Sequence, residues 1–214
     1  MPLQGMRRIF GALAILSSML FAFSANSRGE AESAPPHTTL VFFADRHVNE
    51  AIWPAVFAAL REDLHMADGD QAMAALDPNA ELVRGDQIVP GNTVDSAIVI
   101  RLEGRCDVLP QSSFRLAAGP LGWVDEVHGV IQPFVYIDCR RLALFLSPRA
   151  VGLSQEQRTE MMGRAIAHIT LHEWLHVARQ SAMHGSTGVS QAELTAEELV
   201  ARPTGPVARV AHGR

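Results

Sequence analysis

The sequence predicts an α+β fold in which a set of strands packs against one long helix. Three observations favour this class. Apolar, β-branched runs at 38–44, 95–102 and 121–138 are typical of strands. A helical repeat of apolar residues extends from Ser154 to about Gln180. The chain has 214 residues, 48% of them hydrophobic and 19% charged, which is enough for one domain with a core.

The N-terminal part of the chain is expected to lie outside this domain. Arg7 and Arg8 precede an uncharged run at 9–23, and small residues follow, so residues 1–27 are predicted to be a secretory signal peptide. The run is short for a membrane span, although an uncleaved anchor is the alternative. Residues 28–37 are small, polar and proline-containing, which predicts a linker. We therefore expect a secreted or periplasmic protein without a stable membrane span after signal cleavage.

The domain is expected to cover residues 38–201, beginning with the strand at 38–44. A helix should follow at 49–64, where Ile52, Val56, Ala59 and Leu60 recur at helical spacing. The Gly-, Asp- and Pro-rich stretch 68–92 predicts a loop with short pieces of structure, and the run at 95–102 is the clearest strand.

A hairpin is predicted in the middle of the chain. Runs at 121–127 and 130–138 flank His128-Gly129, which suits a two-residue turn between antiparallel strands. Pro133 lies inside the second run and indicates an edge strand or a bulge. A short helix is expected at 140–146.

The long helix has a recognisable beginning and a core-facing side. Ser154 and Gln157 fit a capping box, in which the two side chains bond each other's backbone N–H groups. Four apolar residues and, after them, two polar residues recur at helical spacing and lie on one face of the helix. These residues are Met162, Ala165, Ile166, Ile169, Glu173 and His176. The last stretch, 202–214, is predicted to be a flexible tail.

The two cysteines, Cys106 and Cys139, are expected to pair. In an oxidising compartment an even number of cysteines is more often disulfide-bonded than free.

The histidine-rich end of the long helix carries a metal-binding pattern. His172 and His176 are four residues apart, so both imidazoles project from one face of a helix and can bind one zinc ion. Glu173 is then placed to accept a proton from a zinc-bound water. A catalytic zinc site needs three protein ligands and an open position. His184, which precedes a glycine-containing turn, is the first candidate for the third ligand. The alternatives are glutamates further along the chain, Glu197 before Glu193 and Glu198.

This pattern resembles the zincin metallopeptidases, and among them the metzincins. Arg179 stands at the metzincin glycine position, and Ala182 stands where the third histidine would be. The stretch HGSTGVSQAELTAEEL is similar to small secreted bacterial zincins that have a longer spacer and a Gly-Ile-Met turn, with Ser190 at the methionine position. The resemblance covers roughly 121–199 and is strong over 168–190. It implies a zincin-like mixed sheet whose edge strand binds an extended peptide beside the active-site helix. The run at 121–127, which contains Gly122 and the acidic Asp125 and Glu126, is the candidate for that edge strand.

The predicted function is a secreted or periplasmic zinc-dependent endopeptidase with Glu173 as its base. The alternatives are a catalytically silent binding protein of the same fold and a zinc amidase acting on non-protein amide bonds. A peptide or protein substrate is expected. Nucleic acid is not, because the net charge is −5 and there is no basic stripe.

Four further assignments concern single side chains. Tyr136, the only tyrosine, is a conceivable second donor to an oxyanion, although a tyrosine in a strand more often serves packing. His168 is expected in the core or behind the metal ligands. Trp174 and Leu175 are expected in the core.

Overall fold

A computed structural model describes most of the predicted domain. The described residues are 37–45, 48–66, 73–89, 91, 94, 96–111, 119–185 and 188–202. The predicted signal peptide, the linker before residue 37 and the tail after residue 202 lie outside this part of the chain.

The strands form one mixed sheet with the order β2-β1-β3-β5-β4. Three neighbouring pairs, β1–β2, β1–β3 and β3–β5, are parallel, and β4–β5 is antiparallel. With the helices described below, this confirms the predicted α+β class. The strand bounds are β1 (Thr38–Ala44), β2 (Glu81–Arg84), β3 (Ser96–Glu103), β4 (Gly122–Val127) and β5 (Val130–Asp138).

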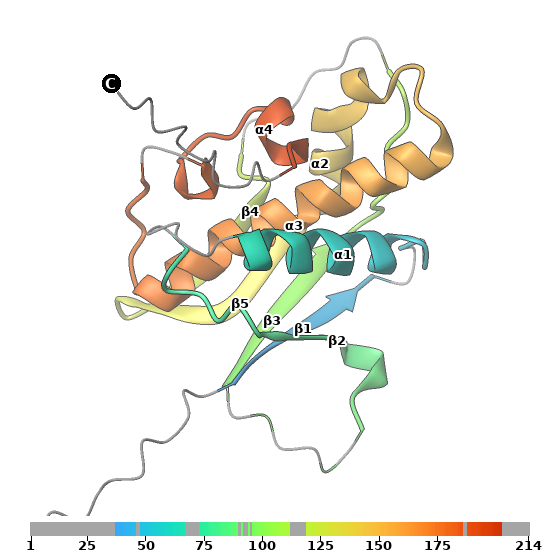
Figure 1. Ribbon diagram of the computed structural model, residues 1–214. Helices are drawn as coiled ribbons and strands as arrows, with labels where there is room; N and C mark the ends of the chain where they lie inside the picture. The colour runs from blue at the N-terminus through green and yellow to red at the C-terminus, as the bar shows by residue number, and fades with distance from the viewer. Residues whose placement is uncertain are drawn as a thin grey trace, which may run out of the picture. The chain divides into compact units, whose positions relative to one another are not determined.

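Two helices, α1 (Ile52–Met66) and α3 (Gln155–Arg179), lie side by side and cover one face of the sheet (Figure 1). The core lies between this layer and the strands, whose inward residues include Leu40, Ile100 and Val135. The other helical elements are α2 (Cys139–Leu146), α4 (Ala196–Val200) and the 3-10 turns η1 (Gly85–Gln87), η2 (Ser147–Ala150) and η3 (Gly188–Ser190).

The long helix α3 follows the sequence prediction closely. Ser154 Oγ accepts from the N–H of Gln157 at 3.2 Å, and Gln157 Oε1 accepts from the N–H of Ser154 at 2.8 Å, which is the predicted capping box. The helix ends at Arg179 with Gln180 as its C-cap. The side chains of its predicted core face are all buried, as are Trp174 and Leu175.

The predicted hairpin is also present, and β4 forms an edge of the sheet. His128 and Gly129 both have positive φ, 53° and 79°, as a type I′ turn requires. Pro133 is not in an edge strand, because β5 lies between β3 and β4. The pairing instead shifts register between Val124 and Glu126, so the bulge is the alternative that holds.

Helix α1 begins at Ile52 rather than at the predicted residue 49. Asn49 accepts a hydrogen bond from the N–H of Ala51 through Oδ1, at 3.0 Å, which forms a local turn before the helix. In the stretch predicted as a loop, β2 and η1 are the short pieces of structure.

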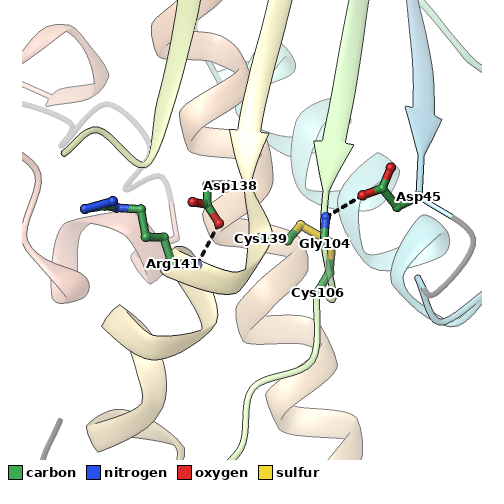
Figure 2. The surroundings of a disulfide bond; sticks show 6 residues. All are labelled: Asp45, Gly104, Cys106, Asp138, Cys139 and Arg141. Carbon is green, nitrogen blue, oxygen red and sulfur yellow. Dashed lines mark hydrogen bonds between the residues drawn. A yellow bond between two sulfur atoms is a disulfide. The ribbon is translucent and has the colours of Figure 1, made fainter. Parts of the chain in front are cut away.

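A disulfide joins Cys106 to Cys139, as predicted (Figure 2). It connects the segment after β3 with the first residue of α2. Nearby, Asp45 Oδ2 accepts from the N–H of Gly104 at 2.8 Å, and Asp138 caps α2 by accepting from the N–H of Arg141 at 2.9 Å. The loop that leads from β3 to the edge strand is therefore fixed at its beginning. None of the described helices is long and apolar enough to span a membrane.

Candidate metal centre

The structure brings His172, His176 and His184 together. The first two project from consecutive turns of α3, and the third follows the helix. Their candidate ligand atoms all lie within 4.8 Å of one another, and no other such group of three or more His, Cys, Asp or Glu residues occurs in the described ranges. The Nε2 atoms of His172 and His176 are 3.2 Å apart.

Two backbone carbonyls determine the tautomers of the helical histidines. Nδ1 of His172 lies 2.6 Å from the carbonyl oxygen of Val189, and Nδ1 of His176 lies 2.7 Å from that of Ser181. A carbonyl can only accept, so each Nδ1 donates its N–H. The neutral rings then direct their Nε2 lone pairs at each other. Metal-bound histidines are usually oriented in this way by a bond from the other ring nitrogen.

The histidine geometry fits a tetrahedral metal ion. Zinc binds imidazole nitrogen at about 2.0–2.1 Å, so two ligands at a tetrahedral angle lie about 3.3 Å apart. The observed separation of the two Nε2 atoms, 3.2 Å, is close to this value. Two nitrogen lone pairs facing each other repel, and a cation between them removes that repulsion.

The positions of His172 and His184 also favour neutral imidazoles. Burial lowers the pKa of His172, and the positive charge that His176 and His184 can carry lowers it further, while the Val189 carbonyl opposes the shift. Desolvation, followed by the effect of His176, lowers the pKa of the more exposed His184. Neutral rings are the form that binds metal.

The chain reverses after α3 and packs a turn beneath the cluster. Gly185 donates its N–H to the carbonyl of Ser190 at 2.8 Å, and the carbonyl of Val189 in η3 holds His172. A Cβ on Gly185 would lie 2.2 Å from Ser190 Oγ, so a larger residue at this position would displace the Ser190 side chain. Ser190 is 7% exposed. Its side chain lies against Gly185, the residue that follows His184.

Glu173 lies beside the cluster and next to the edge strand. It is 7% exposed, and burial raises its pKa to about 7. Within the described part of the chain its carboxylate makes no hydrogen bond or ion pair. A Cβ on Gly122 of β4 would lie 3.3 Å from Glu173 Oε1, so the strand and the carboxylate are in close contact. A buried, unpaired carboxylate is costly in a domain without a ligand, which indicates a functional position.

The glutamates considered as alternative third ligands lie elsewhere. Glu197 forms an exposed ion pair with Arg149 at 2.9 Å, Glu198 caps α4 through Thr195, and Glu193 is exposed. None of the three belongs to the histidine cluster.

The structure decides between the roles suggested for Tyr136 and for His168. Tyr136 alternates with the inward Val135 and Ile137 and stacks on Trp123 at 5.3 Å, on the face of the sheet away from α3. It therefore cannot donate to an oxyanion beside Glu173. His168 lies in the core, as predicted, but it faces Asp63 of α1 at 3.2 Å.

Sequence reasoning missed several contributors to this site. The two orienting carbonyls belong to Ser181 and Val189, and Gly122 is where the edge strand meets Glu173. A backbone carbonyl carries no sequence signal. Gly122 was expected in the edge strand at 121–127, but its contact with Glu173 was not, although a glycine inside a strand often marks a close approach.

Comparisons with protein-family models, with curated proteins and with solved structures gave no match.

Proposed function

We propose that this protein is a zinc-dependent endopeptidase of zincin type, exported to the periplasm or the medium. The observation that carries the proposal is the convergence of three imidazoles beside a buried carboxylate. His172, His176 and His184 would hold the ion and leave one position open, and Glu173 follows the first ligand directly.

Glu173 would perform the proton transfers. Bound zinc would polarise the scissile carbonyl and lower the pKa of a water molecule at the open position. The Glu173 carboxylate accepts the proton of that water and delivers it to the leaving amine. His172 and His176 would not be available for this task, because each uses Nδ1 to bond a carbonyl and would use Nε2 to bind the ion.

The outer edge of β4, which pairs with no other strand in the described part of the chain, offers a place for an extended peptide. The carbonyl of Leu121 accepts from the N–H of Asp138 at 3.0 Å, so Leu121 directs its backbone groups at β5. Since antiparallel pairs alternate, Gly122 and Val124 direct their N–H and C=O groups outward. A substrate strand that adds to this edge would run past Glu173. Backbone hydrogen bonds would hold it, so the binding would depend little on the side chains of the substrate.

Metal dependence is the experiment that tests this function. The purified protein is incubated with a broad peptide library as isolated, after chelation, and after zinc is restored. We expect cleavage that disappears with chelator and returns with zinc. Cleavage that survives complete zinc removal would exclude the proposed chemistry.

The two alternatives give different results in the same assay. A silent binding protein would bind zinc and retain peptides without cutting them. An amidase would leave the library intact but hydrolyse non-protein amide bonds, such as those of cell-wall peptides, with the same dependence on zinc.

A further inference from the structure

A glutamine at the end of α3 links the helix to the β4–β5 hairpin. The side-chain amide of Gln180 accepts from the N–H of Ile131 through Oε1 at 3.1 Å and donates to the carbonyl of Ile131 through Nε2 at 2.9 Å. Nε2 also donates to the carbonyl of Val177 at 2.9 Å. Both ends of the amide are used, so its orientation is fixed.

Ile131 presents backbone groups that no strand satisfies. Val127 and Val130 close the two-residue hairpin as a hydrogen-bonded pair, so the next pair, Glu126 and Ile131, directs its backbone groups away from the ladder. On that side of β5, pairing with β3 begins only at Phe134. The Gln180 amide therefore occupies the place where a neighbouring strand would lie.

The backbone of Gln180 gives a second, independent indication. Its φ of 48° and ψ of 44° are left-handed, a conformation in which a residue with a Cβ is strained. Helices commonly end with glycine at such a position. The hydrogen bonds between the Gln180 side chain and Ile131 explain why glutamine stands at this position instead of glycine.

The linked residues adjoin the proposed metal site. Ser181 follows Gln180 directly, and its carbonyl accepts from Nδ1 of His176 at 2.7 Å. Its N–H donates to the carbonyl of His176 at 3.3 Å. The amide of Gln180 thus fixes the point at which the chain leaves α3 and turns toward His184, and it fixes the hairpin to the same point.

We propose that Gln180 is a positioning residue that holds the substrate-binding hairpin in place against the metal ligands His176 and His184. This inference rests on the proposed function. Gln180 is not one of the three proposed metal ligands, and it would act through Ser181 on one side and through Ile131 on the other.

The test uses two variants of the full protein. Gln180→Gly removes the amide and relieves the backbone strain, and Gln180→Asn tolerates the left-handed conformation but is one methylene too short to reach Ile131. Gln155→Ala is the matched control, because Gln155 is an exposed glutamine at the other end of α3, where its Oε1 accepts from Arg158.

Three quantities are measured: hydrogen exchange of the Ile131 amide without metal, zinc affinity by competition with a chelator, and kcat and KM separately. In both Gln180 variants we expect Ile131 to exchange at least about tenfold faster while core amides are unchanged. We expect zinc to bind roughly tenfold more weakly and KM to rise. The control should match the wild type.

Two results would overturn the inference. The first is unchanged Ile131 exchange together with unchanged zinc affinity in both variants. The second is faster exchange throughout the core, which would indicate global destabilisation. If the wild type binds zinc and cleaves peptides normally, either result would reject only the role of Gln180. Failure of the wild type itself to bind zinc would reject the proposed function, and with it the positioning role.

Discussion

The histidine cluster depends on backbone groups that hold each ring. His172 and His176 each donate Nδ1–H to a carbonyl, one from η3 and one from the residue after the C-cap. Both carbonyls lie in the segment that also carries His184, so the third ligand and the supports of the first two belong to one segment of the chain. These supports are neutral carbonyls rather than carboxylates, so they add no negative charge to the rings that they hold.

The third ligand can be tested at the residue scale. His184→Ala is expected to weaken zinc binding by at least about 100-fold, more than the loss of an outer contact costs. Glu197→Ala is the control, since Glu197 pairs with Arg149 away from the cluster. Chelator competition measures both affinities. A strong loss in the Glu197 variant with no loss in the His184 variant would reverse the assignment.

At this scale the spacing of His172, Glu173 and His176 was enough to predict that the two rings would meet. The position of His184 was harder, because it depends on a chain reversal. That reversal uses the left-handed Gln180 and the close contact of Gly185 with Ser190, neither of which has a distinct sequence pattern.

At the scale of elements, the contact between β4 and α3 is the feature that brings an edge strand to Glu173. Gly122 makes it possible, because a Cβ there would lie 2.3 Å from Ile169 Cγ2. Ile169 precedes Glu173 by about one turn of α3. A displacement of β4 away from Ile169 would therefore also move the strand away from the Glu173 carboxylate.

Gly122→Ala is therefore expected to impair cleavage by roughly tenfold or more and to destabilise the protein by about 1–3 kcal/mol, as overpacking does. Ile169→Ala removes the clashing methyl, so the double variant should lose less than the sum of the losses of the two single variants. Urea unfolding and peptide cleavage measure the coupling between the two sites. Strictly additive losses would show that the two residues are not in contact.

The disulfide is the second element-scale feature with a measurable consequence. The bond closes a loop with a sequence separation of 33 residues that contains the whole β4–β5 hairpin. Replacing both cysteines with serine should cost roughly 3–4 kcal/mol on the chain-entropy estimate. Urea unfolding of the double variant, with reduced wild type for comparison, measures this loss. A stability equal to that of the oxidised wild type would contradict the estimate.

Most elements were predictable because their signals are local. The capping box of α3, the alternation in β5 and the turn residues His128-Gly129 lie within a few positions of the structure they specify. The order of the strands and the single helical layer were not predictable from periodicity, because they depend on packing between segments far apart in the chain. Pro133 shows what local signals cannot predict. A proline cannot donate a hydrogen bond in a strand, which indicated either an edge strand or a bulge, but the choice between the two depended on where β3 lies.

For the whole molecule, zinc should act as a stabilising ligand. Only the folded chain brings the three histidines together, so zinc at about 100 times its dissociation constant should add about 2.7 kcal/mol of stability. In a domain of this size that corresponds to a rise in Tm of roughly 5–10 °C. The variant with all three histidines replaced by alanine should show no rise. An equal rise in that variant would place the stabilising metal elsewhere.

The central claim combines a metal site with a base beside it, and one comparison tests it most directly. Zinc-loaded wild type and zinc-loaded Glu173→Gln are incubated with the same peptide library. We predict equal zinc content and a loss of cleavage rate of about 10²–10⁴-fold in the variant, the usual contribution of a general base. Equal cleavage by both proteins at equal zinc content would contradict the account.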